Sequence, residues 1–496
     1  MAHVAIIGSG FSGLAAACFL AKAGCRVSVL EKNSSAGGRA RQFEVDGFRF
    51  DMGPSWYWMP DVFEKFFNHF GKTTGDYYHL TRLDPSYRIY FGKRDHLDVP
   101  SGVDALADMF ERLETGSGKV FRRFLAEGKF KYEAGINNLV YKNGLSFTDL
   151  FDPAVIRGFT RLHLFRSVSS YVRSFFKEPR LIKLLEFPML FLGATPEKTP
   201  ALYTLMNYAD MALGTWYPHG GMYRIVEAMI SVAVELDVEF TFNSNVTAIE
   251  TIGRRVKGVW ADSKLVHADH VIASADYQYV DQHLIPREFS NYGESYWKNR
   301  VFAPSCLLYY VGLNKKLDGI LHHTLFFDED FEQHAREIYE QPQWPSAPQF
   351  YVSCPSKTDN TVGPANHETL MILVPVAAGL TDRNDIREHY FNLVVERFER
   401  ITGEQMRPHI VYKRSYAHND FMTDYNAYKG NAYGLANTLL QTANFKPSIR
   451  NKKLKNLFYT GQLTVPGPGV PPSIISGQVV ARELLRTQNA KNPISL

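Results

Sequence analysis

Three glycines and one acidic residue near the amino terminus have the types and the spacing that a dinucleotide phosphate site requires. Gly8, Gly10 and Gly13 follow one another in the run G-S-G-F-S-G, and Glu31 stands eighteen residues after the last of them. In such a site the first glycine permits a tight turn, the second lets a pyrophosphate approach the backbone, and the third lets helix and strand pack closely. We expect the Glu31 carboxylate to accept hydrogen bonds from ribose hydroxyls.

The segments around these residues have the order strand, turn, helix, strand. Residues 3–7 (HVAII) and 26–30 (RVSVL) are apolar and favour β structure, and the small-residue run LAAACFLAKA between them predicts a helix. The amino terminus of that helix offers unpaired N–H groups and a partial positive charge to phosphate oxygens. The pattern predicts a βαβ nucleotide site that also includes Phe11, Ser12 and Lys32; a βαβ unit with incidental glycines is the alternative.

A second glycine turn follows Glu31, in the segment KNSSAGGRARQFEVDGFRFDMGPS. The run E-K-N-S-S-A-G-G-R resembles the start of the flavoproteins that include amine oxidases, protoporphyrinogen oxidase and the carotenoid desaturases. This resemblance implies FAD as the cofactor, with the arginine turn along its pyrophosphate and ribityl chain. The D-x-G-P turn that follows in the same group is matched here as well. In this resemblance the further FAD residues are Gly38, Arg39, Gly53, Pro54 and Ser55, with Val246 against the adenine end.

A loop rich in glycine and proline near the other end of the chain is the second strong signal. The run NLFYTGQLTVPGPGVPPSIISGQVVARELL predicts a strand that ends at Gly461, a loop, and a helix begun by Pro471 and its neighbour Pro472. We predict that Gly469 and Val470 bring the loop backbone against a flat ring. The helix terminus would then face the N1/C2=O edge of an isoalloxazine, where negative charge gathers on reduction. The loop resembles the P-G-x-G-x-P segment of carotenoid desaturases and not the aromatic loop of amine oxidases.

Over nearly its whole length the chain is similar to the bacterial-type phytoene desaturases. The stretches that carry the similarity are GSGFSGL, GGRARQFEVDGFRFDMGPS, LGATPEKTPALYTLMNYADMALGTWYPHGGMYRIVEAM and PGPGVPPSIISG. The resemblance implies that FAD takes a hydride from a saturated carbon beside a double bond while a proton leaves the neighbouring carbon, so that phytoene is converted stepwise towards lycopene. Alternatives in this class are a 1-hydroxycarotenoid 3,4-desaturase, a C30 diapophytoene desaturase and a carotene isomerase. A non-catalytic isoprenoid-binding escort is the alternative outside it.

A few polar residues stand beside apolar stretches. Arg166, Asp210 and His219 do so, and each is a candidate to stabilise charge or accept the proton; Arg166 is the first candidate for a catalytic residue. Ordinary helix-surface or capping roles are the alternative for all three. His322 and His323 are adjacent, which is a poor spacing for metal ligands, so we expect a solvent-facing pair and predict no metal site.

The composition limits the partners and the location. The 496 residues are 45% hydrophobic, and the net charge of +4 is too mild to indicate nucleic-acid binding. Four scattered cysteines without a C-x-x-C motif indicate a reducing compartment. The sequence contains no run of about eighteen uncharged apolar residues, so we predict no membrane-spanning helix. We expect a cytoplasmic protein that docks peripherally on the cytoplasmic membrane through residues 151–212 and the aromatic residues 56–58. It would take a hydrophobic carotenoid there and pass electrons to a quinone or oxygen.

Together these segments predict an α/β protein. A Rossmann-like FAD-binding domain is expected to consist of residues 1–90, 219–298 and 426–496. A substrate domain with a mixed sheet is expected to take residues 91–218, which include a helical lobe for substrate and membrane, and residues 299–425.

Overall fold

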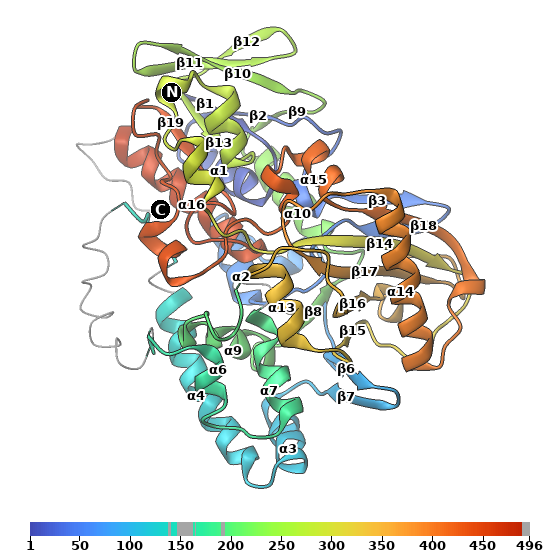
Figure 1. The fold of residues 1–496 in the computed structure, drawn as a ribbon. Helices are drawn as coiled ribbons and strands as arrows, with labels where there is room; N and C mark the ends of the chain where they lie inside the picture. The colour runs from blue at the N-terminus through green and yellow to red at the C-terminus, as the bar shows by residue number, and fades with distance from the viewer. Residues whose placement is uncertain (137–139, 146–161, 164, 190–193, 489–496) are drawn as a thin grey trace.

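The computed structural model describes residues 1–136, 140–145, 162–163, 165–189 and 194–488. It has the predicted α/β architecture, with a parallel sheet and a larger mixed sheet. Several helices gather at one end of the molecule, and a small antiparallel sheet lies at the opposite end (Figure 1). Of the predicted helical segment 151–212, residues 151–161, 164 and 190–193 lie outside the described residues.

The parallel sheet has five strands in the order β19-β13-β1-β2-β9. Val4 and Ile6 of the central strand pack with three helices, while Ala5 and Ile7 face the small antiparallel sheet, so both faces are covered and this strand is apolar from Val4 to Ile7. The strands are β1 (His3–Ile7), β2 (Arg26–Leu30), β9 (Glu239–Thr241), β13 (His270–Ala273) and β19 (Leu457–Tyr459), and the helices are α1 (Phe11–Lys22), α10 (Tyr223–Glu235) and α16 (Val470–Gln488).

Helices α1 and α16 come from opposite ends of the chain and lie side by side (Figure 1). Their contact is made through small residues. A Cβ added at Gly477 of α16 would stand 2.3 Å from the Ser12 carbonyl oxygen and 2.7 Å from the Ala15 Cβ of α1. In the same way a Cβ at Gly13 would stand 2.3 Å from the Gly8 carbonyl oxygen. Glycine at these positions therefore lets the two helices and the first turn approach closely.

The segment 238–250 contributes strands to two different sheets. The chain leaves β9 and turns at Asn243, whose φ is 53°. The Asn243 and Ser244 N–H groups donate to the carbonyls of Asn33 and Glu31, which fixes the turn beside the end of β2. The small antiparallel sheet then consists of β10 (Val246–Ile252), β11 (Arg255–Ala261) and β12 (Lys264–His267).

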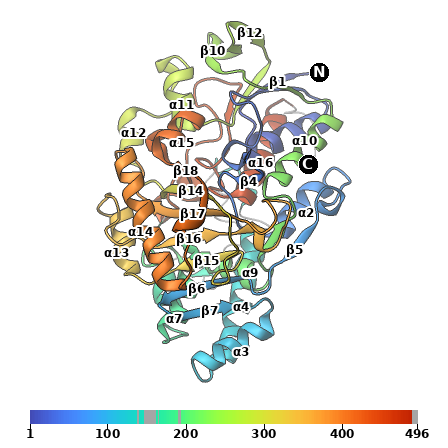
Figure 2. The same ribbon diagram turned by 90° about the vertical axis from the view of Figure 1, so that its right-hand side faces the viewer.

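The mixed sheet has seven strands in the order β18-β14-β17-β16-β15-β6-β7, and only the β15–β6 pair is parallel. Helix α14 covers one face (Figure 2). Alternate residues of β14, among them Leu307 and Tyr309, pack towards α14, while Leu308 and Tyr310 belong to the core on the other face. The elements are β6 (Tyr87–Gly92), β7 (Asp95–Val99), β14 (Ser305–Leu313), β15 (His323–Phe326), β16 (Phe350–Ser353), β17 (Glu368–Val376), β18 (Ile410–Tyr416) and α14 (Asn384–Thr402).

The helical lobe consists of α3 (Val103–Leu113), α4 (Ser117–Ala134), α6 (Val168–Val172), α7 (Pro179–Glu186) and α9 (Leu205–Met211). The remaining elements are β3 (Gln42–Val45) with β4 (Phe48–Asp51), β5 (Leu80–Arg82) with β8 (Trp216–Pro218), α2 (Pro60–Asn68), α11 (Tyr277–Tyr279), α12 (Glu294–Lys298), α13 (Phe331–Tyr339) and α15 (His418–Tyr425). Among the described residues, no helix combines the length and the apolar character that crossing a bilayer requires.

Candidate active site

One cavity of about 390 Å³ brings together segments from both ends of the chain. The opening glycine turn, the Arg39 turn, the segment after β4, the start of β10 and the loop before α16 all contribute walls. The predicted cofactor residues that line the cavity are Gly8, Gly10, Phe11, Ser12, Glu31, Lys32, Gly38, Arg39, Gly53, Pro54, Ser55, Val246, Gly461, Gly469, Val470 and Pro471. Gly13 instead packs behind the turn, as its predicted packing role requires.

The two glycine turns leave room that no described part of the protein fills. Gly8 has φ +94° and Gly38 has φ +54°, a region that side-chain-bearing residues rarely adopt. A Cβ at Gly38 would stand 3.4 Å from the Gly10 Cα, so the turns lie against each other. A Cβ at Gly10 would meet nothing within 4 Å, and this open side belongs to the cavity beside the amino terminus of α1. Such a cradle fits a pyrophosphate.

Glu31 has a different set of partners from the one predicted. Its buried carboxylate accepts from the N–H and hydroxyl of Ser9 at 2.9 and 2.8 Å through Oε2, and from the N–H and amide of Asn33, both at 2.9 Å, through Oε1. Two hydrogen bonds to each oxygen use the capacity of a carboxylate. Glu31 therefore ties the glycine turn to the end of β2, and a ribose hydroxyl would have to replace one of these donors.

Arg39 is buried at the cavity wall with part of its guanidinium unpaired. Its Nη2 donates to the Asn431 carbonyl at 3.0 Å, and the group lies over the Tyr425 ring at 5.2 Å. Burial lowers the Arg39 pKa, while the nearby Asp276 carboxylate raises it. The Nε atom is buried without a hydrogen-bond partner in the structure. A buried N–H of a cation without an acceptor fits an anionic or hydroxyl-bearing ligand beside it.

The loop before α16 presents its backbone to the cavity. Gly467 and Gly469 have φ +136° and +111°, and the Ser473 N–H donates to the Gly469 carbonyl at 3.0 Å in the first turn of α16. The Ser476 hydroxyl accepts from the Gly461 N–H at 3.1 Å, which fixes the helix to the end of β19. The positive end of the α16 dipole is therefore directed at the cavity wall.

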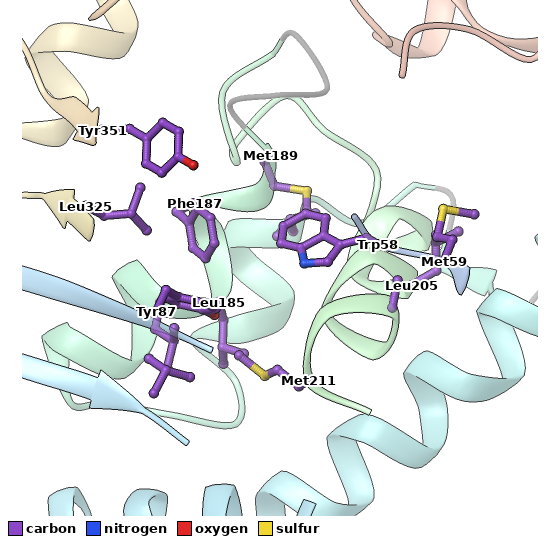
Figure 3. Packing of buried hydrophobic residues seen from close by; sticks show 14 of the residues in the cluster. Trp58, Met59, Tyr87, Leu185, Phe187, Met189, Leu205, Met211, Leu325 and Tyr351 are labelled. Carbon is purple, nitrogen blue, oxygen red and sulfur yellow. The ribbon is translucent and has the colours of Figure 1, made fainter. Parts of the chain in front are cut away.

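The other end of the cavity is apolar. A second pocket of about 30 Å³ adjoins it and shares Tyr351, Leu373 and Tyr433 with the main cavity. Figure 3 shows the surrounding core, in which Trp58, Phe187, Leu325 and Tyr351 come from the segment before α2, the lobe and two strands of the mixed sheet. The side chains that complete these apolar walls include Trp56, Met59, Met206, Cys306, Leu308, Pro304, Phe327, Phe350 and Pro375.

Arg166 does not line this cavity. Its guanidinium donates to the Ser170 carbonyl at 2.7 Å and lies over the Tyr171 ring at 5.3 Å. This placement is the helix-surface alternative, so the proposed catalytic role gains no support from it.

Asp210 and His219 are also absent from the cavity walls. Asp210 accepts from the Tyr87 hydroxyl at 2.6 Å and the Thr215 hydroxyl at 3.0 Å, and burial raises its pKa to about 7. His219 Nε2 lies 2.9 Å from the Thr81 hydroxyl, and its side chain is 41% exposed. Both residues therefore act in packing and in joining elements.

Two expectations about aromatic and histidine side chains were wrong. His322 and His323 are 5% and 0% exposed and do not face solvent. The reason is that β15 lies inside the mixed sheet between β6 and β16, and Trp56 stacks on His323 with 4.0 Å between ring centroids. Residues 56–58 do not form a surface cluster either, because Tyr57 and Trp58 are 0% and 8% exposed and Trp56 lines the cavity.

Sequence reasoning missed the walls that the mixed sheet supplies. Cys306 and Leu308 of β14, Tyr351 of β16 and Leu373 of β17 line the cavity. The available signal was the alternation of a strand, but β14 is buried at every position because both its faces are covered. An apolar run of this kind does not show which of its two sets of residues faces a ligand.

The sequence matches the family described as flavin containing amine oxidoreductase over residues 11–485. A carotenoid 3,4-desaturase from Haloarcula japonica is 41% identical, over 97% of this chain and 98% of its own length. A zeta-carotene-forming phytoene desaturase from Myxococcus xanthus is 32% identical, over 99% and 95% respectively. An oxidoreductase from Methanosarcina mazei and a redesigned putrescine oxidase each superpose with a TM-score of 0.63 at 15% identity. The two superpositions cover 96% and 98% of this chain and 99% and 98% of the matched chains. They show a similarity of fold.

Proposed function

We propose, from the premise that this chain belongs to the flavin containing amine oxidoreductase family and is an FAD-dependent carotenoid desaturase, that it desaturates the 3,4 bond of a long acyclic carotenoid. One observation carries the proposal. Loops that fit a dinucleotide and walls that fit a hydrocarbon line a single continuous cavity. The 41% identity to a 3,4-desaturase, against 28–32% for the phytoene desaturases, favours that bond.

FAD would be held at the nucleotide end of the cavity. The open side of Gly10 and the amino terminus of α1 would take its pyrophosphate, the unpaired Arg39 Nε would donate to it, and the loop at Gly469 would lie along its ring. When bound, FAD supplies the acceptor for a hydride from a saturated carbon beside a double bond.

The protein itself contributes to the reaction by positioning the substrate and by excluding water from the site. A hydrocarbon offers nothing to ionise, so apolar walls must hold the reacting carbons in place and exclude water. Trp56, Trp58, Leu308 and Leu373 form such walls in the main cavity. A 3,4 bond lies near one end of the carotenoid, so only a short piece has to extend beyond the reacting carbons. We place that end in the small pocket behind Tyr351.

Phytoene desaturation is the second candidate, because several phytoene desaturases are similar to the chain over nearly its whole length. The two functions differ in which substrate reacts. We suggest incubating the protein with FAD in liposomes, with a quinone or with oxygen as electron acceptor, and supplying either phytoene or an acyclic carotenoid that is saturated at C3–C4.

The expected result is the loss of two hydrogens and a red-shifted spectrum for the 3,4-saturated carotenoid, while phytoene stays colourless. Colour from phytoene, without reaction of the other substrate, would assign phytoene desaturation instead. The comparison of quinone with oxygen also identifies the electron acceptor. The fold and the FAD site do not depend on which substrate reacts.

A further inference from the structure

A chain of three polar side chains leads from the apolar end of the cavity into the core. The Tyr351 hydroxyl lies 2.6 Å from His323 Nδ1 and donates to Ser55 Oγ at 3.0 Å. Ser55 and Tyr351 line the main cavity, and Tyr351 also lines the small pocket. His323 stands behind Tyr351 and is fully buried. The pair is set by the sheet, since His323 begins β15 and Tyr351 lies on the adjacent strand β16.

His323 is a neutral base with unused capacity. Burial and the neighbouring His322 ring hold the His323 pKa well below its usual range. With Nδ1 facing the Tyr351 hydroxyl, the other ring nitrogen, Nε2, is buried without a hydrogen-bond partner in the structure. Trp56 is stacked nearly parallel on the imidazole, with ring centroids 4.0 Å apart and an angle of 11° between the planes. An indole face is the surface that best stabilises a cation in an apolar surrounding.

The reaction needs such a base. Desaturation breaks two C–H bonds on neighbouring carbons: one hydrogen leaves as a hydride to FAD, and the other must leave as a proton. Once the hydride has gone, positive charge spreads into the adjoining double bonds and makes the second C–H strongly acidic, so a weak base is sufficient. Most ionisable side chains of the cavity, among them Glu31, Arg39 and Asp276, stand at its nucleotide end. At the apolar end Tyr351 has a base behind it.

We propose that Tyr351 and His323 together accept the proton that leaves the carotenoid. The C–H bond breaks and its electron pair forms the new C=C bond. The proton passes to the Tyr351 oxygen while the Tyr351 O–H proton passes to His323 Nδ1, so the tyrosine is restored and the imidazole becomes a cation against the Trp56 face. Ser55 Oγ accepts the Tyr351 O–H in the resting arrangement, so that O–H turns to His323 Nδ1, 2.6 Å away, before the transfer. The proton leaves for water after the product has gone. This inference rests on the proposed function.

The test compares Tyr351→Phe, His323→Asn and the double variant with the wild type. The substrate is the carotenoid that the wild type desaturates, deuterated in turn at each of the two reacting carbons. Each single variant is expected to slow the appearance of the new double bond in a single turnover, followed by its absorbance, by about 100-fold or more, a usual contribution of acid–base catalysis. FAD content and carotenoid affinity should stay within about threefold, and the double variant should be no slower than the singles because the residues act as one unit.

The kinetic isotope effects distinguish a catalytic role from a purely structural one, because loss of a structural role alone would leave them unchanged. In both single variants the effect at the carbon that loses the proton should rise, and the effect at the other carbon should fall. Tyr309→Phe is the matched control, because Tyr309 is equally buried in the mixed sheet but faces α14. Near-wild-type rates in His323→Asn, or additive losses in the double variant, would refute the relay. A wild type that desaturates no carotenoid would instead refute the proposed function.

Discussion

At the scale of single residues, Glu31 has a structural role within the protein in addition to any role in binding a ligand. Its four hydrogen bonds join Ser9 in the glycine turn to Asn33 after β2. The turn has no other side-chain tether of this kind among the described contacts. The shape of the pyrophosphate cradle therefore depends on this carboxylate, whether or not a ribose also reaches it.

Glu31→Ala is expected to reduce FAD retention. The change leaves four donors without an acceptor, and each of the two buried ones, on Ser9, costs about 1–3 kcal/mol when it is unsatisfied. We expect FAD affinity to fall at least about tenfold and the melting temperature of the FAD-free protein to fall as well, measured by calorimetry. Glu31→Gln keeps the size and half of the acceptors and should be intermediate. Unchanged FAD affinity in Glu31→Ala would show that the tether is dispensable.

At the scale of elements, the contact between α1 and α16 aligns the two walls of the site. The backbones of the two helices are close at Gly477 and Ser12, where no side chain separates them. The same helices place Phe11 and Val470 in the cavity wall. A shift between the helices would move the proline loop relative to the glycine turn. The closeness of the helices is therefore a condition for a site of the right width.

Gly477→Ala tests this condition. The new Cβ would stand 2.3 Å from the Ser12 carbonyl oxygen, so the helices must separate, and we expect a loss of stability of about 1–3 kcal/mol together with weaker FAD binding. Gly293→Ala is the control, since a Cβ there meets nothing within 4 Å and φ is −78°. Denaturant unfolding and FAD titration measure both effects. Equal behaviour of the two variants would contradict the argument.

At the scale of the whole molecule, three large apolar side chains are exposed, one in the segment before α6 and two in the loop before β19. Phe165, Leu440 and Phe445 are 81%, 72% and 47% exposed. The Tyr203 hydroxyl of the lobe lies 3.1 Å from the Thr442 hydroxyl of that loop, which holds the two segments together. We propose that these exposed side chains, and not residues 56–58, contact the membrane that supplies the carotenoid.

Phe165→Ser combined with Leu440→Ser is expected to weaken binding to liposomes by about tenfold or more, because burying each side chain contributes about 1.5–3 kcal/mol. Co-sedimentation measures the bound fraction, and FAD content should not change. Val411→Ser removes an exposed apolar side chain from β18, at a distance in sequence from both segments, and should bind as the wild type does. Equal binding by the double variant and the wild type would place docking elsewhere.

The parts of the site that could be predicted from the sequence are those formed by residues that are consecutive in the chain. The glycine turn, the Arg39 turn and the proline loop each carry backbone requirements within a few positions, and all of them line the cavity. His323 and Tyr351 could not be paired from the sequence, because their contact depends on the register of β15 with β16. Burial of His323 depends in turn on Trp56, which is distant in sequence and stacks on it.

The adjacency of α1 and α16 also sets the order of events when the protein is made. The glycine turn and α1 are translated early, but α16 is translated only after both sheets and the lobe. Until then the small-residue face of α1 has no neighbour to cover it. We therefore expect FAD to bind only after α16 has been translated, and chains that lack α16 would expose the apolar face of α1 that α16 covers.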